Sequence, residues 1–374
     1  MTPSPDDLYI VYTGGTTGMP KGVLWRQDDI FMNAMGGKEI GTWIQVNSYD
    51  EVTERAKTGW LRLMALPPLM HGAAQWASFM MLNGGSTVII PTARNLDPSE
   101  IWKTVEAEGV MTMAVVGDAM ARPLLEEYKR GDYNASSLFA IGNGGAPLSA
   151  AIKEELMDAI PNLIINDSLG SSESGAQASH VSSKDSVQTG KFEPGPGADV
   201  ISEDLSSILP AGHEGIGWLA QGGSVPLGYL GDAAKTAKTF PTVEGNRYSV
   251  PGDRAIKRED GAIDLLGRDS QCINSGGEKI FVEEVEMAIV SHPEVADVLV
   301  CGRPSERWGA EVVAVVELTP DASVTEEALS AHASEYISRY KLPKAWVFVD
   351  QVRRSPSGKA DYRWAKEMAA DTLN

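Results

Sequence analysis

Short apolar runs alternate with amphipathic stretches in the first half of the chain, and this alternation restricts the fold more than any other feature. The runs at Leu8–Tyr12, Val110–Val116 and Leu163–Ile165 have the composition of strands, and the first is expected to be buried. Between them, Ile101–Glu108 and Ala150–Ala159 have the apolar spacing of helices. Alternating strands and helices are typical of layered α/β proteins with parallel strand pairing. The sequence therefore predicts a layered α/β core.

A smaller region is predicted downstream of this core. Residues 190–197 are rich in glycine and proline and are predicted to be a connector, and residues 190–267 are predicted to form a β-rich subdomain of a large domain, residues 1–267. After Gly267 the pattern restarts on a smaller scale, so residues 268–374 are predicted to form a compact α+β domain. Its predicted elements are helices Val282–Val290 and Glu326–Ser338, strands Val295–Cys301, Val312–Leu318 and Ala345–Val349, and a polar tail loop.

The charge balance excludes one class of partner. The 374 residues carry a formal net charge of -19, whereas nucleic-acid binding needs a basic face. The sequence has no apolar run long enough for a transmembrane segment and no signal-peptide pattern at its start, so we expect a cytoplasmic protein. Cys272 and Cys301 form neither a metal-ligand pattern nor a disulfide framework, which fits a reducing compartment.

The strongest local signal is the glycine-rich loop between Tyr12 and Gly22. Glycines allow a backbone to turn tightly and to direct several N–H groups at one anion, while threonine hydroxyls and a lysine add further donors. A Walker A loop is excluded, because Pro20 precedes Lys21 and Gly22 follows it. The predicted phosphate ligands are Thr13, Gly14, Gly15, Thr16, Thr17, Gly18 and Lys21.

This loop resembles the phosphate-binding signature of the adenylate-forming superfamily, which comprises acyl-CoA synthetases, luciferases and the adenylation domains of peptide synthetases. Further motifs follow in the family's order up to Lys359, so the resemblance covers nearly the whole chain. It implies an ATP-dependent acyl-CoA synthetase with Mg2+, in which an acid is converted to acyl-AMP and then joined to coenzyme A. It also implies catalytic roles for Lys359, Glu173 and Thr16, and a mobile C-terminal domain.

The resemblance assigns the central motifs to the nucleotide. Gly144, Gly145 and Ala146 match the adenine-binding segment, and Gly142 is predicted to adjoin the substrate. In the motif that follows, Ser172 is expected to contact the α-phosphate and Glu173 to hold Mg2+, which prefers hard oxygen ligands. The other predicted nucleotide contacts in this motif are Asp167, Ser168, Leu169 and Gly170, where Leu169 replaces the family's aromatic residue. Residues 167–169 also mimic the serine motif of a carrier protein, but they follow a buried strand rather than heading a helical domain.

The same resemblance assigns roles to residues nearer the end of the chain. Asp253 would accept hydrogen bonds from the ribose hydroxyls, and Arg268 would bind ribose or phosphate. Asp269 would be the hinge of the C-terminal domain. The pantetheine arm is expected to pass Ser275, Gly276 and Gly277, which lack bulk. Lys359 lies on a polar loop, from which the family's matching lysine enters the active site.

The acid itself is predicted from one segment and from general similarity. His71 and Trp76 match a segment that gates the acyl tunnel in related synthetases, although an apolar helix start of this kind more often packs in a core. The amino-acid sequences of the phosphate loop and of the segment around His71 are most similar to those of actinobacterial fatty-acid and steroid side-chain CoA ligases. A bulky apolar acid is therefore expected.

The phosphate loop starts only a dozen residues from Met1, whereas the family places it after a sizeable subdomain. We therefore expect an N-terminal truncation that removes the first subdomain. Two other functions stay open from the sequence: a non-catalytic nucleotide-binding remnant, and an adenylation enzyme that serves a carrier protein. A homodimer is one possible assembly.

Overall fold

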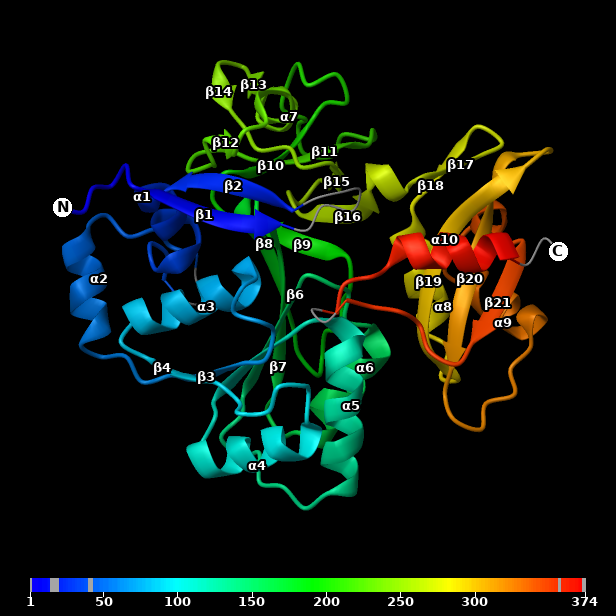
Figure 1. Ribbon diagram of the computed structural model, residues 1–374, viewed down its shortest axis with the longest axis horizontal. Coiled ribbons are helices and arrows are strands. Elements are labelled where there is room, and N and C mark those ends of the chain that lie inside the picture. Colours follow the sequence, from blue (N-terminus) through cyan, green and yellow to red (C-terminus); the bar gives the residue numbers. More distant parts are fainter. Residues whose placement is uncertain (1, 14–19, 40–42, 356–357, 372–374) are drawn as a thin grey trace. The chain divides into compact units, whose positions relative to one another are not determined.

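The computed structural model describes residues 2–13, 20–39, 43–355 and 358–371, and Figure 1 shows their arrangement. The chain divides into two compact units. The first comprises residues up to Leu148 together with Ile152–Leu265, and the second comprises Ser149–Ala151 and the residues from Leu266 onward. Each unit has its own hydrophobic core.

A large sheet forms the centre of the first unit. Its strand order is β10-β11-β15-β16-β9-β8-β7-β6-β5-β3-β4, and the five strands from β7 to β4 are parallel. These five are β3 (Arg62–Ala65), β4 (Thr87–Ile89), β5 (Thr112–Val115), β6 (Ala140–Gly144) and β7 (Ile164–Ser171). The connecting helices are α3 (Gly72–Asn83), α4 (Pro98–Glu108), α5 (Gly117–Arg130) and α6 (Ala150–Ala159). The predicted parallel α/β core is confirmed.

Apolar side chains of these helices and strands make the main core. Trp102 of α4 is buried against Leu124 and Leu125 of α5, and its indole N–H donates to the carbonyl of Leu124 at 2.8 Å. The hydrogen bond satisfies the one polar atom of a side chain that otherwise contributes a large apolar area. Residues on Val110–Val116 and Leu163–Ile165, the two runs predicted to be strands, belong to the same cluster.

The sheet continues with antiparallel strands. They are β8 (Gly175–Ser182), β9 (Lys191–Pro194), β10 (Ala198–Ile201), β11 (Gly217–Gln221), β15 (Asp253–Lys257) and β16 (Ile263–Arg268). The prediction of a plain connector at residues 190–197 was wrong, because β9 lies within it. Phe192 is buried and pairs with Ile263 of β16, so a single aromatic residue anchors a strand among glycines and prolines.

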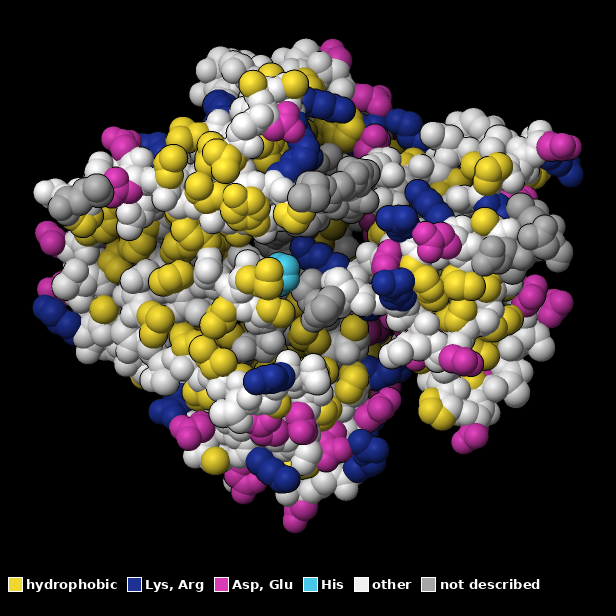
Figure 2. Space-filling view, in the orientation of Figure 1, with side chains coloured by type: hydrophobic (Ala, Val, Ile, Leu, Met, Phe, Trp, Pro, Cys, Tyr) yellow, Lys and Arg dark blue, Asp and Glu magenta, His cyan; other side chains and the backbone are white. Residues whose placement is uncertain are grey.

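A separate three-stranded sheet contains β1 (Leu8–Thr13), β2 (Lys21–Arg26) and β12 (Gly228–Tyr229). The prediction that the first strand is buried was wrong for one of its faces. Val11 is 4% exposed, but Leu8, Ile10 and Tyr12 are 57%, 40% and 56% exposed. Side chains alternate along a strand, so an all-apolar strand at a sheet edge can leave one face open. Figure 2 shows hydrophobic surface over β1 and α3. Phe79 of α3 is also exposed.

Short elements complete the first unit. They are α1 (Gln27–Ile30), the π-helix Phe31–Met35, α2 (Tyr49–Ala56), α7 (Ala233–Thr239), β13 (Thr242–Val243) and β14 (Asn246–Arg247).

The second unit is an α+β fold around a three-stranded sheet. Its elements are the 3-10 helix Asp269–Gln271, β17 (Ile273–Ser275), β18 (Glu278–Ile280), α8 (Val282–Val290), β19 (Val295–Ser305), β20 (Gly309–Leu318), α9 (Glu326–Ala333), the 3-10 helix Arg339–Lys341, β21 (Ala345–Val349) and α10 (Tyr362–Asp371). β19 and β20 are antiparallel, and β20 and β21 are parallel.

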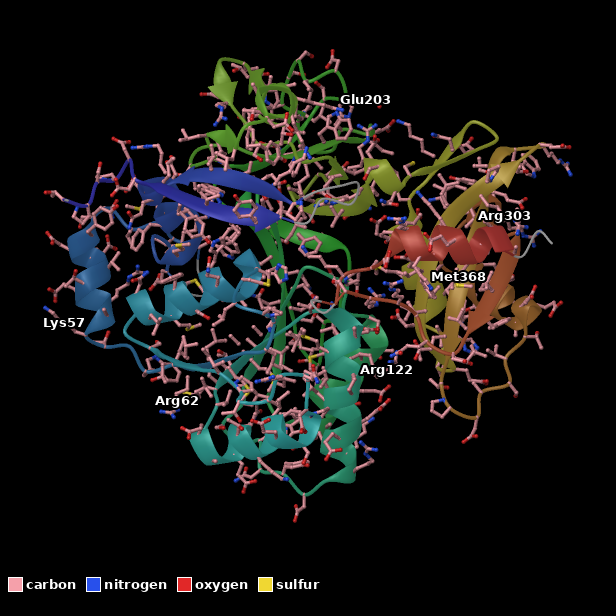
Figure 3. The ribbon with its side chains drawn as sticks, viewed as in Figure 1. Lys57, Arg62, Arg122, Glu203, Arg303 and Met368 are labelled. Carbon is pink, nitrogen blue, oxygen red and sulfur yellow. The ribbon has the colours of Figure 1, made fainter. Side chains whose placement is uncertain are left out.

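Two predictions for this unit need correction. The helix that begins at Glu326 ends at Ala333 and not at Ser338. The predicted tail loop is followed by α10, which packs through Ala365 and Ala369, with Met368 beside them (Figure 3). Its buried stripe consists largely of alanine, which gives little hydrophobic contrast against the polar residues around it. Among the described residues, none of the helices has the length and apolar character to cross a bilayer.

Candidate active site

Glu173 lies in the turn between β7 and β8, where three other segments fix it. The hydroxyl of Tyr229 on β12 donates to Glu173 Oε1 at 2.7 Å. The backbone is held as well: Ser249 Oγ donates to the carbonyl of Glu173 at 2.7 Å, and Trp25 Nε1 donates to the carbonyl of Ser172 at 2.9 Å. Glu173 is 9% exposed. Its carboxylate is therefore a nearly buried group in a fixed orientation.

A buried asparagine supports the same turn from behind. Asn33 Nδ2 donates to the carbonyls of Ser174 and Ser224 at 3.1 and 3.0 Å, and the N–H of Ala176 donates to Asn33 Oδ1 at 2.9 Å. Gly175 has φ +70°, and a Cβ there would lie 2.2 Å from Asn33 Oδ1. Only glycine allows the chain to pass this close to the asparagine. Two sequence-distant segments thus define the position of the Glu173 turn.

Two lysines lie beside the Tyr229 ring. Lys21 Nζ is 5.7 Å and Lys235 Nζ is 4.9 Å from the ring centroid, and Lys21 also pairs with Asp232 at 3.1 Å. Partial burial lowers the pKa of Lys235, and the neighbouring Lys21 lowers it further, while Glu173 and Asp232 oppose the change. The backbone N–H of Lys235, followed by Lys21, lowers the pKa of Asp232. Two cations and two carboxylates therefore surround one tyrosine, an arrangement suited to a phosphate group with a divalent cation.

This cluster joins two of the predicted site residues, Lys21 and Glu173, with three that sequence reasoning missed. The missed residues, Tyr229, Asp232 and Lys235, lie close together in the sequence. An aromatic residue with two charges in a glycine-containing turn was the available signal, but neither periodicity nor spacing distinguishes it from a surface turn. Ser249 was also missed, because its hydrogen bond to the Glu173 carbonyl joins segments far apart in the sequence.

Much of the phosphate loop falls outside the described residues, and this includes the predicted ligands Gly14, Gly15, Thr16, Thr17 and Gly18. Its two flanks are described. Thr13 ends β1 and is the cross-strand partner of Lys21 at the start of β2. The loop is thus the connection of an antiparallel hairpin, which brings its two ends together.

The predicted adenine segment lies beside the following motif on parallel strands. Gly142 pairs with Asn166, and Gly144 pairs with Ser168. Leu169 and Gly170 lie on β7, and Ala146 follows the end of β6. Asn166 to Ser171 belong to β7, so this strand extends beyond the predicted strand Leu163–Ile165. A Cβ at Gly142 or Gly145 would have no heavy atom closer than 3.9 Å. The glycines therefore leave open space that a flat ring could approach.

Asp167 has a different environment from its neighbours. Its carboxylate is buried and accepts from Lys153 Nζ at 2.5 Å and from Asn143 Nδ2 at 2.8 Å. Lys153 is fully buried and also donates to the carbonyl of Gln188 at 2.6 Å, while Asn143 Oδ1 accepts from the N–H of Gly117 at 2.7 Å. The side chain of Asp167 thus joins α6, β6 and α5 to β7. A contact of Asp167 with a nucleotide would have to come through its backbone.

The remaining predicted nucleotide residues are divided between the units. Asp253 begins β15, is 9% exposed and follows Gly252, whose φ is +112°. In the second unit, the N–H of Arg268 donates to Glu283 Oε1 at 3.2 Å, and Asp269, the predicted hinge, begins a 3-10 helix next to the boundary between the units.

The predicted pantetheine segment forms the turn between β17 and β18. Ser275 ends β17, and Gly276 and Gly277 have φ +60° and +92°. The N–H of Gly276 donates to the carbonyl of Trp308 at 2.8 Å, and a Cβ at Gly276 would lie 2.9 Å from the Trp308 ring. Glycine is thus required at position 276 by both its backbone conformation and its neighbour.

The predicted acyl-gating residues lie at the start of α3. His71 precedes the helix, and its carbonyl accepts from the N–H of Gln75 at 3.0 Å. Trp76 is 7% exposed and meets the Trp25 ring edge-on, with centroids 6.5 Å apart. Its Nε1 donates to the hydroxyl of Tyr9 at 3.1 Å. Trp76 therefore packs in the cluster beneath the three-stranded sheet, which also contains Tyr229.

Lys359 is exposed and lies in the second unit on the turn between Arg354 and Ala360, which form a β-bridge. The N–H of Ser355 donates to the carbonyl of Lys359 at 2.8 Å, and the N–H of Lys359 donates to Ser355 Oγ at 3.2 Å.

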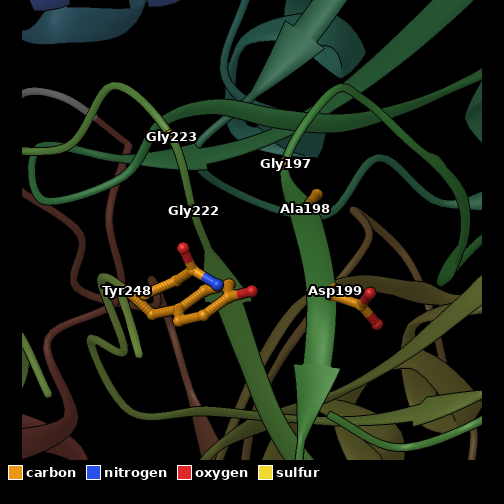
Figure 4. A pocket seen from close by; sticks show the side chains of 7 residues that line it. Gly197, Ala198, Asp199, Gly222, Gly223 and Tyr248 are labelled. Carbon is orange, nitrogen blue, oxygen red and sulfur yellow. The ribbon is translucent and has the colours of Figure 1, made fainter. Parts of the chain in front are cut away.

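None of the predicted site residues lines either of two cavities. One, of about 350 Å³, lies in the first unit (Figure 4), and its lining residues are Gly197, Ala198, Asp199, Gly222, Gly223, Asn246 and Tyr248. The other, of about 550 Å³, lies in the second unit beside Cys272, Cys301, Lys366 and Arg303, which is labelled in Figure 3. Arg303 pairs with Glu311 at 2.7 Å. Within the described ranges, no group of three or more His, Cys, Asp or Glu side chains is placed to hold a metal.

Comparison with known proteins identifies the class. The AMP-binding enzyme family model matches residues 1–230, and the AMP-binding enzyme C-terminal domain model matches residues 284–359. The chain belongs to the AMP-binding enzyme family. Its relatives place it among the acyl-CoA ligases of that family, so the predicted class of AMP-forming enzyme with ATP and CoA as substrates is confirmed.

Two relatives and one structure illustrate the match. The Medium-chain acyl-CoA ligase Mig of Mycobacterium avium is 59% identical over 98% of this chain and 67% of its own length. The 3-oxocholest-4-en-26-oate–CoA ligase of Rhodococcus rhodochrous is 42% identical over 97% of this chain and 67% of its own length. ATP-bound MatB from Rhodopseudomonas palustris superimposes with a TM-score of 0.80 at 22% identity, covering all of this chain and 70% of MatB. The chain thus spans about two thirds of the length of the curated relatives it matches.

Proposed function

We propose that this chain activates a bulky apolar carboxylic acid, a medium-chain fatty acid or a steroid side-chain acid, as acyl-AMP and transfers the acyl group to CoA. One observation carries the proposal: Lys21, at the end of the predicted phosphate loop, and Glu173 meet at the Tyr229 ring. The substrate class follows from the names of the relatives, which are a medium-chain acyl-CoA ligase and a steroid-acid ligase.

In the first half-reaction, the substrate carboxylate attacks the α-phosphorus of ATP, and pyrophosphate leaves. Lys21 and Lys235 would hold phosphate oxygens, and Lys359 would offset charge as it develops on the α-phosphate. In the second half-reaction, the CoA thiolate attacks the acyl carbonyl, and AMP leaves. Each of these residues acts by positioning and by charge and not as a nucleophile.

The carboxylate of Glu173 fits a Mg2+ ion. It is a hard oxygen ligand held in place by one hydrogen bond, from Tyr229 to Oε1, and Mg2+ takes few protein ligands when it also binds substrate phosphates. Bound there, Mg2+ would neutralise phosphate charge. Arg268 and Asp253 are proposed to hold the ribose and phosphate side of the nucleotide, with Asp269 as the hinge and His71 beside the acyl group.

ATP–pyrophosphate exchange tests this proposal. We expect exchange with medium-chain fatty acids and steroid side-chain acids and little with acetate, and we expect Glu173→Gln to reduce it about 100-fold. Exchange that ends in acyl transfer to a carrier protein but not to CoA would instead support the carrier-protein alternative. A folded chain without exchange for any acid would support a nucleotide-binding remnant.

The compartment and the assembly are also proposals. We propose a cytoplasmic location, and a homodimer stays a prediction that sedimentation velocity of the purified chain would test.

A further inference from the structure

An ion pair joins the turn that carries Lys359 to the sheet of the second unit. Arg354 Nε donates to Asp297 Oδ2 at 2.6 Å, and Arg354 Nη2 donates to Asp297 Oδ1 at 2.7 Å. The third nitrogen, Arg354 Nη1, donates to the carbonyl of Gly358 at 3.2 Å. The side chains of Arg354 and Asp297 are only 21% and 17% exposed. A two-pronged pair of this kind fixes orientation as well as distance.

The strand that supplies Asp297 is irregular at this point. The register of β19 against β20 shifts between Val295 and Asp297, which marks a β-bulge. Bulges change the direction in which a strand's side chains point. The bulge and the ion pair together connect a core strand with the Lys359 turn.

A second contact holds the far side of the turn. Tyr362, at the start of α10, donates its hydroxyl to Glu286 Oε2 at 3.1 Å, and Glu286 Oε1 accepts from the N–H of Val300 at 2.8 Å. Glu286 lies on α8 and Val300 on β19. Arg354 on one side of Lys359 therefore contacts β19, and Tyr362 on the other side contacts α8, while the side chain of Lys359 is exposed.

We propose that Asp297 is a positioning residue for adenylation: through Arg354 it sets the conformation of the turn from which Lys359 acts. The inference rests on the proposed role of Lys359. Hydrogen bonds join Ser355 to Lys359, but among the described contacts the Asp297–Arg354 pair alone ties Arg354 to β19 through side chains. Without the pair, the lysine would sample many positions, and the fraction near the α-phosphate would fall.

The proposal separates the two half-reactions. Lys359 is needed for adenylation and not for thioester formation, so loss of its positioning should slow the first step alone. A residue that merely supports the fold of the second unit would affect both steps equally.

The central variant is Asp297→Asn, which keeps the size of the side chain and removes its charge. We expect ATP–pyrophosphate exchange to fall at least about tenfold in kcat with little change in the KM for ATP. Thioester formation from preformed acyl-AMP should stay within about twofold of wild type. Asp297→Glu should recover part of the exchange.

The matched control is Arg353→Gln. Arg353 pairs with Asp361 across the same turn at 3.4 Å, but the two side chains are 65% and 32% exposed. An exposed pair contributes little, so this variant should leave both half-reactions unchanged.

A double variant distinguishes this inference from the function on which it rests. If Lys359→Ala abolishes exchange, adding Asp297→Asn should cause no further loss, because the lysine is already absent. Exchange lost with Lys359→Ala but retained with Asp297→Asn would overturn the positioning role alone. Exchange retained with Lys359→Ala would overturn the proposed role of the lysine itself. Equal loss in both half-reactions with Asp297→Asn would make Asp297 a purely structural residue.

Discussion

Tyr229 contacts the charged side chains of the candidate active site. Its hydroxyl orients the carboxylate of Glu173, and its ring face lies against the ammonium groups of Lys21 and Lys235. A ring face attracts cations, so one side chain serves both signs of charge.

Removal of this hydroxyl should weaken the use of Mg2+. In Tyr229→Phe the ring remains, but Glu173 Oε1 loses its donor, and partners of this kind typically change metal affinity about 10–100-fold. We expect a matching rise in the Mg2+ concentration needed for half-maximal ATP–pyrophosphate exchange. Tyr49→Phe, which removes a half-exposed tyrosine hydroxyl on α2, serves as the control. An unchanged Mg2+ requirement in Tyr229→Phe would contradict the orienting role.

Lys235 is expected to contact the pyrophosphate side of ATP. Lys235→Gln should raise the KM for pyrophosphate in the exchange reaction about tenfold, because a charged hydrogen bond is lost. Lys238→Gln on the same helix removes an exposed lysine and should have no such effect. The two variants measured side by side in exchange assays test the prediction, and equal KM values would refute it.

Lys153 and Asp167 should matter for stability more than for chemistry. Lys153→Met leaves a buried carboxylate without its cation, and such a loss costs about 3–5 kcal/mol. Lys129→Met breaks the pair of Lys129 with Glu155, whose side chains are 49% and 50% exposed, and should cost about 0–1 kcal/mol. Urea unfolding monitored by tryptophan fluorescence gives both values. Similar losses of unfolding free energy in the two variants would show that the buried Lys153–Asp167 pair stabilises the fold no more than an exposed pair.

At the scale of elements, helices and strands could be predicted where apolar and polar residues alternate clearly. Helix α8 has the predicted bounds, and its predicted stripe of Val282, Val285, Ala288 and Ile289 is buried. Helix α10 was missed because its buried stripe is made of alanines, which resemble surface residues in a polar segment. The exposed face of β1 was unpredictable for the opposite reason, since apolar residues there lack a covering partner among the described residues.

The packing of α8, α10 and β19 raises the pKa of one carboxyl group. Burial raises the pKa of Glu286 from 4.5 to about 8, and the neighbouring Glu283 adds to the rise. The N–H of Val300, Arg354 and the hydroxyl of Tyr362 oppose it. Because the folded state favours the protonated form, the stabilising contribution is full below pH 4.5 and is lost as the pH rises through 8.

Glu286→Gln should remove this pH dependence, since glutamine imitates the protonated acid and can still accept from Val300. We expect its melting temperature at pH 8 to exceed that of wild type by roughly 4 °C, with little difference at pH 5. Differential scanning calorimetry at the two pH values provides the measurement. The control is Glu284→Gln. Glu284 lies on the same helix as Glu286, and the substitution breaks its ion pair with Lys341. A constant difference between wild type and Glu286→Gln at both pH values would rule out the titration of this group.

At the scale of the whole molecule, the order of the motifs could be predicted from the sequence. The contacts between their residues could not. Lys21 and Glu173 were assigned from local signatures, whereas Tyr229 and Asn33 act through tertiary contacts that neither sequence segment encodes alone. The polar loop that carries Lys359 was likewise predicted, while the ion pair of Arg354 with Asp297 joins residues far apart in the sequence. Local signatures therefore yield the chemical groups, and long-range packing determines how they are held.

The place of Lys359 just ahead of α10 has a practical consequence. A protease that cuts after this lysine would release the helix that covers β19 and, with it, the tyrosine that borders the turn. Nicked enzyme would then keep the β1–β2 hairpin of the first unit while losing the proposed acid activation. Residual nucleotide affinity in aged preparations is accordingly a poor guide to their remaining ligase activity.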